Sequence, residues 1–174
     1  MQVSTRNIIR FLSFLSFIIL FCPFFQTCSD KSISNLPKIK ENNNIFQKNQ
    51  LIKKSKKEYT FNGYQIAYIF ADETFFIKER RIVDLTDFLD SMISIGFIIL
   101  ILFSIWIFYL SLFNNNIIYK ISILNLSVLL ISIILLTLEK NFENINQIKI
   151  GFYLFLLNSI LIIYFCRKEL KLSK

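Results

Sequence analysis

Four long runs of apolar residues constrain the fold of this chain more than any other feature of its sequence. They cover residues 8–25, 92–113, 117–138 and 150–166 and consist mainly of Ile, Leu and Phe. A helix of about 20 apolar residues crosses the hydrocarbon core of a bilayer, and it satisfies all its backbone hydrogen bonds internally. We therefore predict an all-α integral membrane protein with four transmembrane helices.

The apolar runs also predict how the chain is organised. Transmembrane helix 1, at residues 8–27, has Arg6 just before it and Arg10 in its first turn, and so has the charged start of a signal-anchor sequence. A three-helix transmembrane region occupies residues 92–166, and a basic cytoplasmic tail occupies residues 167–174. The three helices of that region are expected at residues 92–113, 117–138 and 150–166.

Between the first and second spans, residues 28–91 form a small extracytoplasmic insert. Residues 28–57 are rich in Asn, Lys and Ser and predict a flexible linker. The Asn-Gly pair at 62–63 predicts a β-hairpin at residues 58–71, since both positions of a type I′ turn need positive φ. Residues 72–91 alternate charged and apolar residues with a helical period and predict an amphipathic helix at the membrane interface.

The predicted hairpin would place its aromatic side chains on one face. A lone hairpin is marginally stable in water, so this face needs a surface to cover it. The membrane, the other helices or a partner protein are the candidates. The predicted partner surface consists of Tyr59, Phe61, Tyr64, Tyr68 and Phe70.

Two polar residues lie well inside the predicted spans. Asn125 is in the third apolar run and Asn158 in the fourth, and a short connection makes these two helices an antiparallel pair. A hydrogen bond between the two side chains would contribute about 0.6–2 kcal/mol to helix packing. We predict this interhelical contact, with a contact to a partner helix as the alternative.

The basic residues predict a bacterial inner-membrane protein whose N-terminus and C-terminus are both cytoplasmic. Arg6, Arg10 and the basic tail follow the positive-inside rule. In this orientation, however, thirteen Lys and Arg residues lie outside against seven inside. A loop of about 60 residues translocates largely regardless of its charge, so we favour this topology over the inverted one, which stays open.

One residue type that carries much enzyme chemistry is missing from this chain. It has no His, which excludes Ser-His-Asp and Cys-His nucleophile pairs and His-based zinc sites. Asp84, Asp87 and Asp90 recur at every third position, and we interpret them as a solvated helix face, with a divalent-cation site as the alternative. We therefore predict a protein that is not an enzyme and binds no cofactor or metal.

The segment FCPFFQTCSD, residues 21–30, has two interpretations. It is either the outer end of the first span or a processing site at which Cys28 becomes a lipid-modified N-terminus. Thr27 is larger than the small residue that usually precedes a lipidated Cys. Three further spans also make a lipid anchor redundant, so we favour the first interpretation.

The segment PFFQTC at the end of the first run, together with NGYQIA at 62–67 and three closing spans, resembles a group of small membrane proteins of Bacteroidetes-like bacteria. The resemblance implies a first span that ends in a Pro-aromatic-…-Cys stretch, an external Gly-x-Gln-x-Ala segment and a C-terminal helical bundle. It implies no particular activity.

These observations predict a non-enzymatic interaction protein, either an accessory subunit of a membrane complex or a toxin-immunity-type protein. Its expected partners are the lipid bilayer and another membrane or periplasmic protein, with no nucleic acid. The alternatives are a membrane-embedded sensing or signalling module that acts through its basic tail, and a lipid-anchored membrane protein modified at Cys28.

Overall fold

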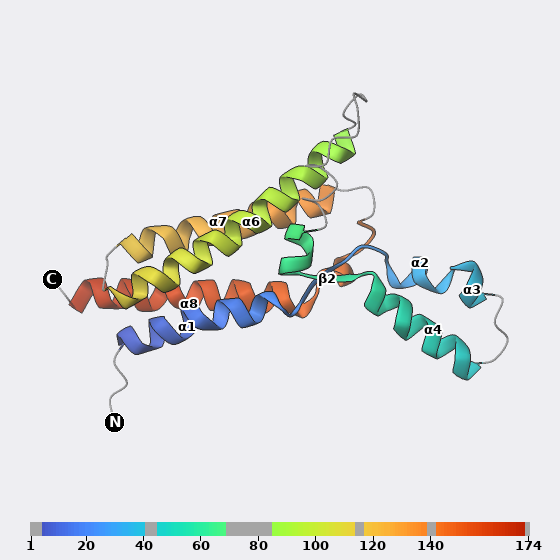
Figure 1. The fold of residues 1–174 in the computed structure, drawn as a ribbon, viewed down its shortest axis with the longest axis horizontal. Helices are drawn as coiled ribbons and strands as arrows, with labels where there is room; N and C mark the ends of the chain where they lie inside the picture. The colour runs from blue at the N-terminus through green and yellow to red at the C-terminus, as the bar shows by residue number, and fades with distance from the viewer. Residues whose placement is uncertain (1–4, 41–44, 69–84, 114–116, 139–141, 173–174) are drawn as a thin grey trace.

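The structure is a computed structural model that describes residues 5–40, 45–68, 85–113, 117–138 and 142–172. These residues form an elongated bundle of long helices with a smaller helical arm at one end (Figure 1). Helix α1 begins and helix α8 ends at the opposite end of the bundle from the arm.

Helices dominate the described chain. In chain order the elements are α1 (Thr5–Leu20), β1 (Pro23–Gln26), α2 (Asp30–Ser34), α3 (Pro37–Lys40), α4 (Ile45–Glu58), β2 (Thr60–Asn62), a short helix at 63–68, α6 (Leu85–Leu112), α7 (Ile117–Leu138), a 3-10 turn (Ile145–Gln147) and α8 (Ile150–Leu172). We call α2, α3 and α4 the arm, and α1, α6, α7 and α8 the bundle.

The bundle packs with α6 and α7 along one side and α1 and α8 along the other (Figure 1). Helix α8 contacts both α1 and α7, and α6 contacts both α7 and α1. Two apolar clusters fill the interior. One lies towards the arm and includes Phe24, Phe97 and Phe155. The other lies towards the termini and includes Ile9 and Ile162.

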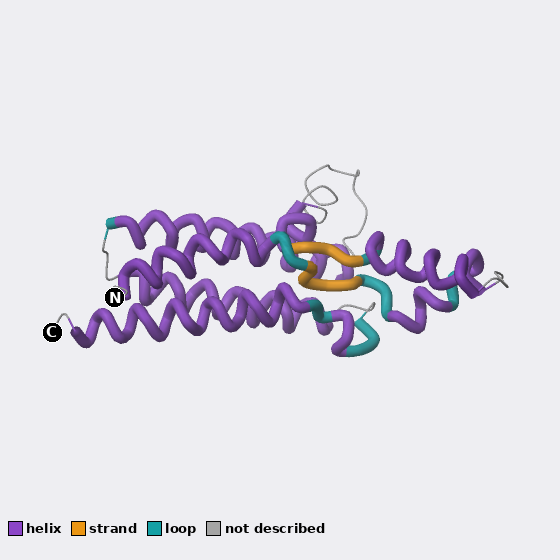
Figure 2. The backbone as a smooth tube through the Cα atoms, turned by 90° about the horizontal axis from the view of Figure 1, so that it is seen from below, coloured by secondary structure: helices purple, strands orange, loops and turns teal. Residues whose placement is uncertain are grey.

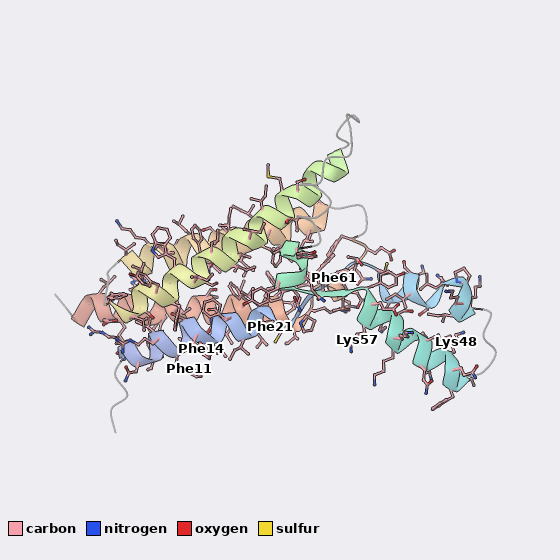
Figure 3. All side chains as sticks on the ribbon, viewed as in Figure 1. Phe11, Phe14, Phe21, Lys48, Lys57 and Phe61 are labelled. Atoms are coloured by element: carbon pink, nitrogen blue, oxygen red, sulfur yellow. The ribbon has the colours of Figure 1, made fainter. Side chains whose placement is uncertain are left out.

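Beside its apolar clusters the bundle buries small polar side chains, and it exposes many large apolar side chains on its outside. Figure 3 shows Phe11, Phe14 and Phe21 along the outer side of α1, and all three are exposed. The bundle helices bury these polar residues: Ser13, Ser16, Ser94, Ser104, Ser111, Ser122, Asn125, Ser132, Asn158 and Ser159. In water a continuous apolar exterior is unfavourable, whereas in lipid small and polar residues are expected at helix–helix contacts.

Three helices are long and apolar enough to cross a membrane, by length and composition: Ser91–Leu112, Ile117–Leu138 and Ile150–Lys171. The prediction of four such spans is therefore wrong for the described chain. Helix α1 has 16 described residues, which rise about 24 Å. It ends at Leu20 because the chain turns there and enters β1 at Pro23, a residue that does not continue a helix.

The ends of the other spans differ less from the prediction. Helix α7 has the predicted bounds of the third span. Helix α8 begins at the predicted residue but continues to Leu172, so most of the predicted basic tail extends the last span as a helix. Helix α6 begins at Leu85, so residues 85–91 of the predicted interfacial helix belong to α6, and residues 72–84 lie outside the described chain.

The predicted hairpin at 58–71 is also wrong. Strand β2 pairs with β1, antiparallel, with Phe25 opposite Phe61 and Gln26 opposite Thr60. Figure 2 shows the two strands between the bundle and the arm. Instead of turning the chain back, residues 63–68 continue as a helix, and residues 69–71 lie outside the described chain.

A capping box explains why the Asn-Gly pair starts a helix. The backbone N–H of Gln65 donates to Asn62 Oδ1 at 2.8 Å, and the backbone N–H of Asn62 donates to Gln65 Oε1 at 3.0 Å. Gly63 is needed for close packing, since a Cβ there would lie 2.7 Å from Leu20 Cδ2. The Asn-Gly pair therefore serves a helix N-terminus.

The segment predicted as a flexible linker, residues 28–57, contains the three helices of the arm. Ser29 caps α2 by accepting from the backbone N–H of Ser32. Ile33 and Ile39 are fully buried although the surrounding residues are mostly Lys, Ser and Asn. These few apolar residues fix α2 and α3 against α4, which composition alone did not indicate.

Gly151 provides a test of the packing between β1 and α8. A Cβ at this position would lie 2.6 Å from the carbonyl oxygen of Pro23 and 2.7 Å from Phe24 Cδ2. Because backbone has to move to make room, we expect Gly151→Ala to lower the free energy of unfolding by about 1–3 kcal/mol. The measurement is chemical or thermal unfolding in a neutral detergent.

Gly96 provides the matched control. Its Cβ would meet the hydroxyl oxygen of Ser132, and Ser132 Cβ is at an ordinary 3.5 Å. The double variant Gly96→Ala, Ser132→Ala removes that clash and should be close to wild type. Equal stability of Gly151→Ala and the wild-type protein would contradict the close contact of β1 with α8.

Candidate functional site

The arm joins the bundle through a network of buried amides. Gln147, in the turn before α8, donates from Nε2 to the carbonyl oxygens of Gln26 and Thr27 at 3.1 and 3.2 Å. Its Oε1 accepts from the backbone N–H groups of Glu143 and Asn144. Gln26 and Gln147 are both almost completely buried. The turn between α7 and α8 is therefore fixed to the strand that leads into the arm.

Two carboxylates strengthen this junction. Asp30 accepts from Gln26 Nε2 at 3.1 Å and pairs with Lys56 Nζ at 2.8 Å. These contacts hold the pKa of Asp30 below its usual value, with Lys56 as the largest cause. Glu143 accepts hydrogen bonds from the hydroxyls of Ser29 and Ser32, which hold its pKa below the usual value.

Cys28 lies in this junction and is half-buried with a free thiol. Its carbonyl oxygen accepts from Gln26 Nε2, and its neighbour Thr27 donates its backbone N–H to Tyr59 O at 3.0 Å. Lipidation of Cys28 stays the alternative interpretation of this segment.

The predicted hydrogen bond between Asn125 and Asn158 is wrong. Asn158 Nδ2 donates to Leu12 O at 3.0 Å and to Ser16 Oγ at 2.8 Å, both on α1. Helix α8 lies between α1 and α7 and turns this side chain towards α1, a direction that sequence spacing does not specify. Both Asn residues are buried, and within the described chain their Oδ1 atoms have no hydrogen-bond donor.

The predicted aromatic partner surface is divided among three places. Phe61 and Tyr64 pack against the bundle core, and the Tyr64 hydroxyl donates to Phe17 O. Tyr68 is 70% exposed. Tyr59 lies at the base of the arm, and Phe70 lies outside the described residues.

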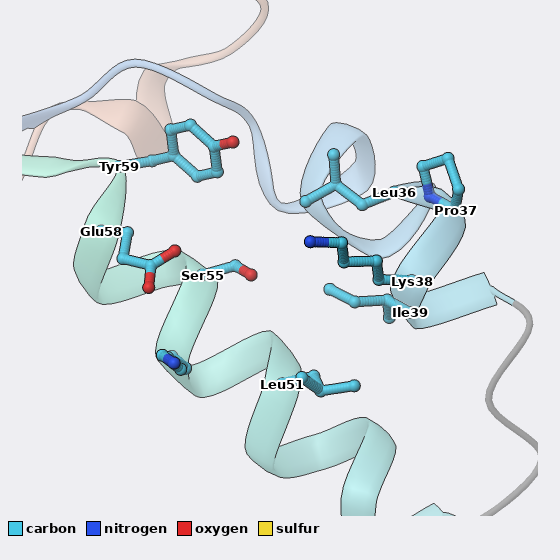
Figure 4. A pocket seen from close by; sticks show the side chains of 9 residues that line it. Leu36, Pro37, Lys38, Ile39, Leu51, Ser55, Glu58 and Tyr59 are labelled. Carbon is cyan, nitrogen blue, oxygen red and sulfur yellow. The ribbon is translucent and has the colours of Figure 1, made fainter.

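A hollow of about 440 Å³ lies between α3 and α4 in the arm (Figure 4). Its apolar side chains include Leu36, Ile39 and Leu51, and its cations are Lys38 and Lys54. A second hollow of about 340 Å³ continues along α4 and shares Leu51 and Lys54 with the first. The full lining of the two is Leu36, Pro37, Lys38, Ile39, Gln47, Gln50, Leu51, Lys54, Ser55, Glu58 and Tyr59. We call this the arm groove.

The surface around the arm groove is strongly basic. Residues 29–40 and 45–58 contain eight Lys and two acidic residues, Asp30 and Glu58. Figure 3 shows Lys48 and Lys57 at opposite ends of α4. At the far end of the same helix Ile45 and Phe46 are 77% and 71% exposed. The arm thus combines a concave apolar strip, a cationic surface and an exposed apolar end.

The apolar strip, the cationic surface and the exposed apolar end of the arm are suited to binding another molecule. Within the described chain no three His, Cys, Asp or Glu side chains are grouped so that they could hold a metal ion. The alternative cation site at Asp84, Asp87 and Asp90 is not described, because Asp84 and the side chains of the other two lie outside the described set. The arm groove was missed by sequence reasoning, although Ile33, Leu36 and Ile39 do recur at every third position.

No protein-family model matches this chain, and no similar protein was found among curated proteins or solved structures. The resemblance to small membrane proteins of Bacteroidetes-like bacteria therefore stays a prediction.

The ion pair between Asp30 and Lys56 predicts a loss of stability in acid. Because the pKa of Asp30 is lower in the folded protein than in the unfolded chain, its contribution is present above about pH 4 and is lost as the pH falls through the lowered pKa. We expect Asp30→Asn to lower the midpoint of thermal unfolding at pH 6 and to have little effect at pH 3. An equal effect at both pH values would contradict a charged contact.

Proposed function

We propose that this protein is an integral protein of a bacterial inner membrane in which α6, α7 and α8 cross the bilayer and α1 lies beside α8 in the same layer. Support comes from the large apolar side chains exposed on the outside of the bundle and from the small polar side chains buried between its helices. Ser13 and Ser104 donate to the carbonyl oxygens four residues earlier in their own helices, at 2.8 Å. Such pairing removes the cost of placing a hydroxyl in a dry environment.

The proposed orientation places the start of α1 and the end of α8 in the cytoplasm and the arm outside, so α1 and the extended β1 that follows it carry the chain across the layer, although α1 alone is shorter than the three spans. Arg10 supports it by donating to the carbonyl oxygens of Ser111 and Leu112 at the end of α6. Arg6 pairs with Glu169 at 3.3 Å. These cations gather at the end of the bundle opposite the arm, as the positive-inside rule favours for a cytoplasmic face. The eight lysines of the arm keep the inverted topology as the alternative.

The first helix is proposed to remain part of the mature protein, as a signal anchor. Cleavage before Cys28 would remove α1 and β1 together. It would take Leu20, Phe24 and Phe25 out of the core and leave Asn158 without its partners on α1. Lipid modification at Cys28 stays the alternative, and it carries this large cost in packing.

The proposed role is that of a non-enzymatic interaction protein whose arm contacts another membrane or periplasmic protein. An accessory subunit and a toxin-immunity-type protein are both of this kind. The observation that carries the proposal is the arm itself: a basic, grooved projection with an exposed apolar end. Gln147 joins it to the bundle, and the Asp30–Lys56 pair joins α2 to α4 within it. Apolar strips rimmed by polar residues are typical of protein interaction sites.

A photo-crosslinking residue at Phe46 tests this role in native membranes. Benzoylphenylalanine replaces an exposed aromatic ring there, and the same residue at Phe11 is the matched control on the outer face of α1. We expect position 46 to give a reproducible adduct of defined mass with one protein, and position 11 to give lipid adducts. The absence of a protein adduct from position 46 would contradict the proposed role of the arm.

A further inference from the structure

We propose that the arm groove binds an extended, acidic and partly apolar peptide segment of a partner protein. This inference rests on the proposed function, because it names the chemistry of the partner that the arm would contact. It is carried by the shape of the groove, its apolar floor and the charges along its walls.

The shape favours an extended ligand over a compact one. The two hollows meet at Leu51 and Lys54, so the concave surface runs along more than two turns of α4, from Gln47 to Glu58. A peptide in an extended conformation advances about 3.3 Å per residue and can follow such a strip. Segments of this kind bind through alternate side chains that enter pockets.

The floor favours an apolar side chain in the ligand. Leu36 and Leu51 are half-buried and face each other from opposite walls, with buried Ile39 between them (Figure 4). Covering such carbon surface contributes about 25 cal/mol for each Å² removed from water. A leucine-sized side chain of the ligand would complete the contact between α3 and α4.

The walls of the arm groove favour acidic groups in the ligand. Lys38 and Lys54 border the groove, and neither forms an ion pair with another residue of the described chain. Lys56 on the same helix is already paired with Asp30. The free cations in the groove lie on a surface with a large excess of Lys, which attracts an acidic segment and opposes a basic one.

Glu58 favours a peptide over a phosphate polymer as the ligand of the arm groove. Its carboxylate lines the groove together with the hydroxyls of Ser55 and Tyr59 (Figure 4). A phosphate chain offers only acceptors, so none of its groups can donate a hydrogen bond to this carboxylate. The backbone N–H groups of a peptide can donate hydrogen bonds to the Glu58 carboxylate. Its acidic side chains can at the same time pair with Lys38 and Lys54. The groove therefore fits a peptide better than a nucleic acid or a lipid phosphate.

Peptide binding to the full-length protein in phosphatidylcholine nanodiscs tests the inference. The probe is a fluorescein-labelled decapeptide of alternating Glu and Leu, followed by fluorescence anisotropy. We expect the double variant Lys38→Glu, Lys54→Glu to weaken binding about tenfold or more, since two attractions become repulsions. The matched control is Lys48→Glu, Lys57→Glu, which changes the net charge equally outside the groove and should weaken binding less than about threefold.

Three further measurements complete the test. Leu51→Ala should weaken binding of the Glu-Leu peptide, and a Gln-Leu peptide should bind more weakly than the Glu-Leu peptide. Fluorescein-labelled polyphosphate should bind more weakly than the Glu-Leu peptide and should be insensitive to Leu51→Ala.

Equal weakening by the two double variants would overturn the inference, because it would indicate general attraction by the arm. Tighter binding of polyphosphate, or no binding of the Glu-Leu peptide, would overturn it as well. These failures are distinguishable from failure of the proposed function. A protein adduct from position 46 together with no peptide binding would contradict only the peptide chemistry, whereas the lack of any adduct would contradict the interaction role.

Discussion

The backbone of β1 is hydrogen-bonded along both of its edges, and the bundle and the arm both depend on it. One edge pairs with β2, and on the other the backbone N–H of Lys149 donates to Phe24 O at 2.9 Å. The ring of Phe24 packs against Phe97 of α6 and Phe155 of α8. Only a glycine at position 151 lets α8 approach this closely. The short strand β1 thus joins the bundle to the arm.

The second constraint is the cost of burying polar groups in the bundle. The hydroxyls of Ser13, Ser16, Ser104 and Ser111 donate within their own helices, so as donors they do not hold one helix against another. Asn158 differs because its amide reaches the carbonyl oxygen of Leu12 and the hydroxyl of Ser16 on α1. This contact makes α1 part of the bundle, although α1 is shorter than the three helices that could span a bilayer.

The sequence predicted the long helices well, because their apolar runs have the length that a bilayer requires. The bounds of α7 were predicted to the residue. The predicted hairpin failed because Gln65, three residues after Asn62, forms a capping box that local turn statistics do not weigh. The arm was missed because a few buried residues such as Ile33 and Ile39 outweigh a polar composition. The partner of Asn158 depends on which helix packs against each side of α8. The spacing of residues along the sequence does not specify this.

The central claim is that α1 is packed against α8 as a permanent part of the bundle. Disulfide formation in native membranes tests it directly, with the native cysteines replaced by Ser and new pairs introduced by Ser16→Cys with Asn158→Cys. We predict that copper phenanthroline joins this pair and leaves the pair Asn125→Cys with Asn158→Cys largely reduced. Failure of the first pair to form a disulfide would contradict the placement of α1 beside α8, whereas joining of the second pair would contradict only the orientation of Asn158 towards α1.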